Sequence, residues 1–130
     1  MMKILNQFTL LSAWIAVAST PTLAHHSGQF FTDETVTLTG VVKEMQLTNP
    51  HSWLEMMVPN VDGEVVQWSI EMSTPIQLFR AGWTRATVKP GDKVTVVVHP
   101  MRDGRPGAAY VSIALPDGST LSQRFTANPP

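Results

Sequence analysis

The chain has 130 residues, 43% of them apolar and 15% charged, which is the composition of an ordinary globular protein with one domain. It contains no cysteine, and this excludes disulfides, thiolate metal sites, haem attachment through cysteine and lipid-modified cysteine. The formal net charge is -1, and nothing in the composition indicates a nucleic-acid partner.

Residues 1–24 have the features of a cleaved signal peptide. Lys3 supplies the positive charge, and residues 4–18 form an apolar run that is followed by small residues. This run is too short and too interrupted for a membrane span. Cleavage is possible after Ala18, the last residue of "AVA", or after Ala24, the last residue of "TLA". We favour Ala24, and we predict export to the periplasm or the medium.

The remaining residues 25–130 predict a single domain built of β-strands, and the first strand covers residues 35–47. Its apolar residues lie at even positions up to Leu38 and at odd positions from Val41. A change of phase by one residue beside a glycine is typical of a β-bulge. We therefore predict one long strand, bent at Gly40.

Two further strands, at residues 51–58 and 64–72, are joined by "PNVDG", whose Asp-Gly marks a turn. A short helix follows in "STPIQLFRAGW", with Thr74 as its N-cap, Pro75 in the first helical position and Gly82 at its end.

The turn "KPGD" then leads to a strand at residues 93–99, and a final strand at residues 107–115 is expected to bury Val111, Ile113 and Leu115. Three strands, one helix and two strands in this order, with a long bent first strand, are typical of the OB-fold. We predict an all-β protein: a five-stranded OB-fold-like barrel with one short helix between strands three and four. A β-sandwich is the alternative, but it has no natural use for that helix.

The register of the second and third strands brings distant polar residues together. Apolar matching places Leu54 opposite Ile70, so the odd positions must share the other face of the sheet. Trp53 is then directly opposite Glu71, with His51 on the diagonal. We therefore expect His51 and Glu71 to be neighbours.

The four histidines predict a metal site if cleavage makes His25 the first residue. An N-terminal histidine offers its amine and a ring nitrogen, and His51 or His99 would add a further imidazole. Nitrogen-rich coordination favours Cu(II), and the amine titrates at about pH 8, so copper can displace its proton. His26 is an additional candidate ligand, and Glu71 would orient His51 or bind axially. The competing interpretation is that the His25–His26 pair belongs to a tail without a metal.

Function is therefore predicted as a periplasmic metal-binding protein, with copper the preferred ion. The alternative is a metal-free OB-type module that binds an envelope partner or a small anionic ligand near Arg102 and Arg105, in the loop between the last two strands. The sequence offers no evident substrate platform or redox partner, so we do not predict an enzyme.

A series of short motifs resembles small exported bacterial proteins grouped as the domain of unknown function 6152. They are "AHHS", "VTLTGVV", "TNPHSWLEM", "WSIEM", "LFRAGW", "VKPGDKVTV", "PMRDGRPGA" and "LPDGSTL". The resemblance implies export and an OB-like barrel, but no chemistry, because the activity of that family is uncharacterised. Its typical positions correspond here to His25, His26, Asn49, Pro50, His51, Trp68 and Glu71. "TNPHSW" departs from the pattern, since no aromatic residue stands just before Asn49, and this puts a stacking role there in doubt.

Overall fold

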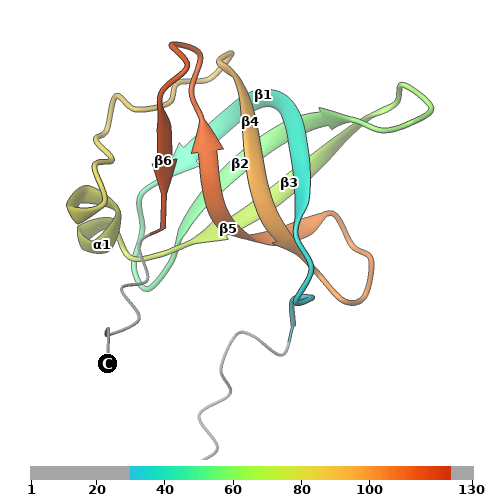
Figure 1. Ribbon diagram of the computed structural model, residues 1–130, viewed down its shortest axis with the longest axis horizontal. Coiled ribbons are helices and arrows are strands. Elements are labelled where there is room, and N and C mark those ends of the chain that lie inside the picture. Colours follow the sequence, from blue (N-terminus) through green and yellow to red (C-terminus); the bar gives the residue numbers. More distant parts are fainter. Residues whose placement is uncertain (1–29, 124–130) are drawn as a thin grey trace, which may run out of the picture.

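A computed structural model describes residues 30–123 of the chain (Figure 1). Within this part, the first five strands and the helix follow the predicted order, and a short sixth strand that was not predicted comes last. The elements are β1 (Val36–Gln46), β2 (Ser52–Pro59), β3 (Val65–Met72), α1 (Pro75–Arg80), β4 (Lys93–Pro100), β5 (Gly107–Ala114) and β6 (Thr120–Ser122).

The strands form one sheet in the order β3-β2-β1-β4-β5-β6, in which neighbours are antiparallel. A short parallel pairing between β3 and β5 joins the two sides of this sheet and closes a five-stranded barrel. The strand β6 lies outside the barrel, as a hairpin partner of β5. The predicted fold, an all-β OB-fold-like barrel with one helix, is confirmed.

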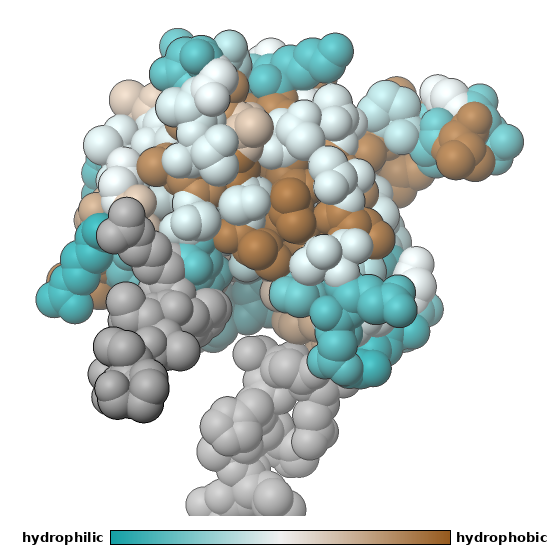
Figure 2. All heavy atoms as spheres, in the orientation of Figure 1, coloured by the Kyte–Doolittle hydropathy of each residue, from teal (hydrophilic) through white to brown (hydrophobic). Residues whose placement is uncertain are grey.

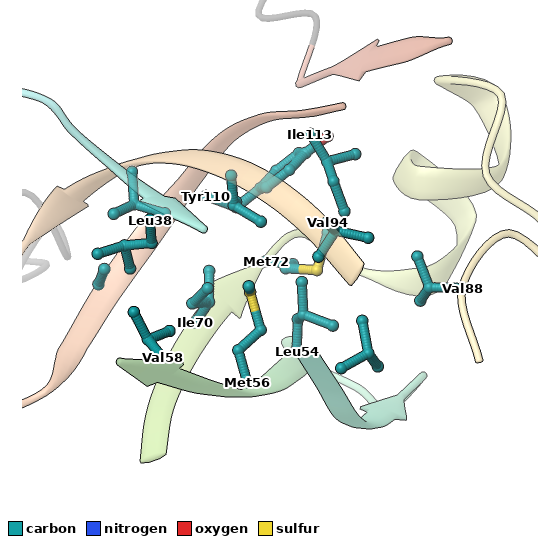
Figure 3. Close-up of a cluster of buried hydrophobic side chains, with 14 of the residues drawn as sticks. Leu38, Leu54, Met56, Val58, Ile70, Met72, Val88, Val94, Tyr110 and Ile113 are labelled. Carbon is teal, nitrogen blue, oxygen red and sulfur yellow. The ribbon is translucent and has the colours of Figure 1, made fainter. Parts of the chain in front are cut away.

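The interior of the barrel is filled by the even-numbered residues of β2, β3 and β4, as the alternation of these strands predicts (Figure 3). Leu54 lies opposite Ile70 and Met56 opposite Trp68, which is the expected register. Burying one such large apolar side chain contributes about 1.5–3 kcal/mol. The fully buried apolar residues of these three strands are Leu54, Met56, Ile70, Val94, Val96 and Val98.

The first strand bends, but the predicted position of its bulge is wrong. β1 pairs with β4 as far as Val41 and with β2 from Val41 onwards, and the register shift lies between Val42 and Glu44. Gly40 has a different role, because a Cβ atom there would collide with the carbonyl oxygen of Met57. The glycine therefore allows the backbones of β1 and β2 to approach closely.

The last strand shows a second difference from the prediction. β5 buries Ala108 and Tyr110 before its phase changes to Ile113, whereas Val111 is only partly buried. A register shift between β4 and β5 accounts for this change. The hydroxyl of Tyr110 donates a hydrogen bond to the carbonyl of Leu121 at 2.8 Å, which fastens β6 to the barrel.

The helix α1 begins and ends where the sequence predicts. The Thr74 side chain caps it by accepting a hydrogen bond from the backbone N–H of Gln77, and Pro75 is the first helical residue. After the helix, Gly82 adopts a φ of 98°, a conformation that favours glycine. The buried side chain of Leu78 anchors the helix to the core.

Candidate functional site

A cavity of about 550 Å³ lies beside the seam that closes the barrel. β3 and β5 pair only from Ser69 with Gly107 to Glu71 with Ala109. Beyond this point β3 continues towards α1, whereas β5 turns along β6 (Figure 1). The cavity is lined by Phe31, Pro50, His51, residues 71–74, Gln77, His99, residues 109–111 and Gln123.

His51 and Glu71 form a close pair at the edge of this cavity. The Nδ1 atom of His51 lies 2.5 Å from the Oε1 atom of Glu71, so the predicted proximity is confirmed. Glu71 is held in register between Trp53 on β2 and Ala109 on β5. The Glu71 side chain is 21% exposed and that of His51 is 43% exposed, so the imidazole is the more accessible partner.

His99 approaches the same cavity from the other side of the seam. It lies on β4 opposite Ala109, which in turn is paired with Glu71, so these three residues form one row across three strands. Its Nδ1 atom lies 3.1 Å from the backbone carbonyl oxygen of Glu34. His99 therefore faces away from the valine core, as expected, and His51 and His99 share a cavity.

The segment before β1 also reaches the cavity. Phe31 forms an isolated antiparallel bridge with Met101, and the backbone of Phe30 accepts a hydrogen bond from the N–H of Arg102 at 2.9 Å. These contacts attach the segment to the loop between β4 and β5, and they place Phe31 in the cavity wall. His25 and His26 lie outside the described residues.

The structure brings His51, Glu71 and His99 to one cavity, but not into one preformed ligand shell. Among residues 30–123, no group of three or more His, Asp or Glu side chains is close enough to hold a metal ion.

The two arginines of the alternative anion site do not converge. Arg105 pairs with Asp103 at 2.7 Å, and Arg102 approaches Asp33 at 3.4 Å. Hydrogen bonds from Arg105 hold the pKa of Asp103 below its usual value. Each guanidinium group therefore faces a carboxylate, Arg105 one in its own loop and Arg102 one in the segment before β1.

A separate polar network crosses the outer surface of β2 and β3. Glu55 accepts a hydrogen bond from the hydroxyl of Ser69 and another, at 2.9 Å, from the side-chain amide of Gln67. The carbonyl oxygen of Gln67 in turn accepts one from Lys43 at 2.7 Å. The network occupies the same outer face as Glu71 and Trp53, because all these residues take odd positions in the two strands.

Most of the cavity wall was not anticipated from the sequence, including Phe31, Gln77 and Tyr110. Burial raises the pKa of the Tyr110 phenol, so this side chain is a neutral hydrogen-bond donor in the wall. A signal for Tyr110 is present in "GAAYVSIAL", whose apolar residues fit neither even nor odd alternation and so indicate an irregular strand. No comparable signal marks Phe31 or Gln77.

Residues 13–109 match a family of unknown function, DUF6152. The chain belongs to this family. Membership in DUF6152 confirms the resemblance seen in the sequence motifs, and it assigns no activity. No curated protein and no solved structure matches the chain. In the described part of this DUF6152 protein, no helix is long and apolar enough to cross a membrane.

Proposed function

We propose that this protein is exported and binds a metal ion, preferably copper, in the cavity beside the β3–β5 seam. The proposed ligands are the amine and ring of a mature N-terminal His25, together with His51 and His99. His26 and Glu71 are further candidates. The observation that carries the proposal is that two imidazoles, from different elements, line one cavity beside the segment that leads back to His25.

The length of the chain is compatible with this arrangement. Phe30 is attached at the loop between β4 and β5, and His25 stands five positions before it in the sequence. Five extended residues span at most about 17 Å. Because the next residue, Phe31, lines the cavity, this reach is compatible with an N-terminal histidine at the cavity.

Copper is favoured by the chemistry of the donors. An amine and imidazoles provide nitrogen ligands, which bind Cu(II) more strongly than the other divalent ions of the first transition series. Amine and imidazole must be unprotonated to bind, and both lose their protons near neutral pH when unperturbed. The described residues provide no three-ligand group, so high affinity should depend on His25.

The first test is the intact mass of the exported protein, which gives the cleavage site. Cleavage after Ala24 is expected. A mature chain that begins at Ser19 would refute the N-terminal chelate, because His25 would then have no free amine.

The second test is a Cu(II) titration of the mature protein and four variants. His25→Ala and His51→Ala are each expected to weaken binding by at least about tenfold. A serine inserted before His25 keeps the ring but moves the amine, and it should weaken binding as much as His25→Ala. Thr95→Ala, on β4 but away from the cavity, serves as the matched control. Equal affinity in all variants would refute the proposed site.

The alternative function is a metal-free module that holds a small ligand or an envelope partner. The size of the cavity and its partly aromatic wall, with Phe31 and Tyr110, favour this reading over a loop-based anion site. Equal copper affinity in all variants, together with binding lost on Phe31→Ala in a fragment screen by NMR, would support it.

A further inference from the structure

His51 and His99, the two histidines of the cavity, each have a hydrogen-bond partner at the same ring nitrogen, Nδ1. The Nδ1 atom of His51 meets the carboxylate of Glu71 at 2.5 Å, and the Nδ1 atom of His99 meets the backbone carbonyl of Glu34 at 3.1 Å. A carbonyl oxygen and an ionised carboxylate accept hydrogen bonds and cannot donate them. In both rings, Nδ1 must therefore be the donor and carry the hydrogen.

This assignment determines what the other ring nitrogen offers. A neutral imidazole has a single N–H, so a hydrogen on Nδ1 leaves the lone pair on Nε2. In free histidine the other tautomer, with the hydrogen on Nε2, is the more populated one. The fold therefore selects, at both positions, the form in which Nε2 is ready to bind a metal without losing a proton.

We propose that the cavity binds its metal through the Nε2 atoms of His51 and His99, and that Glu71 is a positioning residue, not a ligand. This inference rests on the proposed metal function and deepens it. The Oε1 atom of Glu71 is already used by His51, and its side chain is half as exposed as that of His51. A carboxylate behind an imidazole orients the ring and raises its basicity, which strengthens the bond to the metal.

The assignment also restricts the class of metal. Among the described residues that line the cavity, Glu71 is the only carboxylate, and its Oε1 atom is already engaged by His51. Ca²⁺ and Mg²⁺ bind through oxygen ligands, whereas imidazole suits copper, nickel and zinc. The site is therefore expected to bind Cu²⁺ and Zn²⁺ and to exclude Ca²⁺ and Mg²⁺.

The tautomers are measurable without any metal. Long-range ¹H–¹⁵N NMR spectra of the labelled mature protein, above the titration range of imidazole, distinguish N–H from unprotonated nitrogen in each ring. We expect hydrogen on Nδ1 in both His51 and His99. Glu71→Gln keeps an acceptor and should keep this pattern, whereas Glu71→Leu should return His51 to the Nε2–H form. His99, whose acceptor is backbone, is the internal control for folding. Hydrogen on Nε2 of wild-type His51 would overturn the proposal.

The role of Glu71 is tested with Zn²⁺ as a diamagnetic probe. Binding should shift the Nε2 resonances of both rings while their Nδ1 hydrogens remain. Affinity should fall by about ten- to a hundredfold in Glu71→Leu and by much less in Glu71→Gln, because an amide oxygen still orients the ring. Equal losses in the two variants, or coordination through Nδ1, would contradict a positioning role. Unchanged spectra with Zn²⁺ and Cu²⁺ would refute the metal function itself, whereas the metal-free tautomers would still report on the orientation of the rings.

Discussion

The two outer faces of the barrel differ in chemistry although they enclose the same core. On what we term the hydroxyl face, β1, β4, β5 and β6 carry a group of small, uncharged outward residues, and Lys93 at the start of β4 is a charged exception. The group consists of Thr37, Thr39, Thr95, Val97, Ser112, Ala114, Thr120 and Ser122. Figure 2 shows mainly white and brown atoms over β4 and β5, with teal atoms towards the rim. The carboxylate face, on β1, β2 and β3, carries Glu44, Glu55 and Glu71 with Lys43, Gln67 and Ser69.

The charged side chains of the two faces and their hydrogen-bond partners are therefore concentrated on the carboxylate face. Glu44 lies directly opposite Glu55, and like charges in such positions destabilise a sheet. Hydrogen bonds from Gln46 to Glu44, and from Gln67 and Ser69 to Glu55, offset the repulsion. The cavity lies at the edge of the carboxylate face, where Glu71 supports His51.

The largest effect is expected at Gly40, where β1 passes from β4 to β2 and so from one face to the other. In Gly40→Ala the new methyl group would collide with the carbonyl of Met57. A backbone atom cannot move aside as a flexible side chain can. We expect the free energy of unfolding to fall by about 2 kcal/mol or more, measured by urea denaturation.

Gly91→Ala is the matched control for this variant. Gly91 has a φ of 93° and open space around its Cα, so alanine there brings conformational strain but no collision. Its expected loss is about 1–2 kcal/mol. A Gly40→Ala variant as stable as the wild type would show that β1 does not need this close contact to link the two faces.

A second comparison uses two residues of β4, four positions apart. His99 lies at the cavity, and Thr95 lies on the hydroxyl face. His99→Ala is expected to lower Cu(II) affinity by at least about tenfold, whereas Thr95→Ala should leave it unchanged. Isothermal titration of the mature proteins measures both. A loss in Thr95→Ala as large as in His99→Ala would mean that the metal site is not confined to the cavity.

Much of the difference between the two faces was predictable from the sequence, because the alternation of apolar and polar residues decides which side of a strand faces the core. The even positions of β2 and β3 gave their register, and the register placed His51 beside Glu71. Turn and capping residues such as Thr74 predicted the helix, since their effects are local.

Features that depend on long-range contacts were missed. The bulge of β1 was predicted at Gly40 but lies after Val42, because the phase of a strand responds to both of its partners. Likewise, β6 is only three residues long, and Tyr110 secures it by a hydrogen bond to Leu121. The cavity itself arises where β3 and β5 diverge, and no local pattern records that divergence.

Tyr110 lies between the cavity and β6: it lines the cavity and is bonded to Leu121 of β6. Burial raises its pKa above the ordinary value of 10.0, so the unfolded chain releases the phenol proton before the folded protein does. Its contribution to stability is therefore complete below pH 10 and is lost as the pH rises further. Tyr110→Phe lacks the hydrogen bond to Leu121, which is worth about 1 kcal/mol, and it has no phenol to titrate at this position.

The expected result is a stability gap between wild type and Tyr110→Phe that is constant at neutral pH and narrows above pH 10. Denaturation at several pH values measures it. Phenolate absorbance reports the titration directly, because Tyr110 is the only tyrosine of the chain. A gap that stays constant through alkaline pH, or a phenol that titrates at its ordinary pKa, would contradict the burial argument.

A smaller effect is expected when the coupling energy of one hydrogen-bonded pair on the carboxylate face is compared with that of one pair on the hydroxyl face. Glu55 and Ser69 are paired on the carboxylate face, and their bond involves an ionised acceptor. A double-mutant cycle with Glu55→Ala and Ser69→Ala is expected to give a coupling energy of about 1 kcal/mol, favourable and weakened by salt. Coupling near zero would show that the network adds no stability to its face.

The smallest effect is expected for the Thr39–Thr95 pair on the hydroxyl face. Their hydroxyl groups lie 3.0 Å apart across β1 and β4, and both are neutral. Thr39→Val and Thr95→Val remove the hydroxyls with little change of shape, and their coupling should be about 0.2–1 kcal/mol, without salt dependence. If the coupling energy of Thr39 and Thr95 were as large and as salt-sensitive as that of Glu55 and Ser69, the two faces would not differ in the electrostatic strength of their side-chain pairs. A weak, salt-independent value would show that the hydroxyl face stabilises the barrel by packing and neutral cross-strand contacts alone.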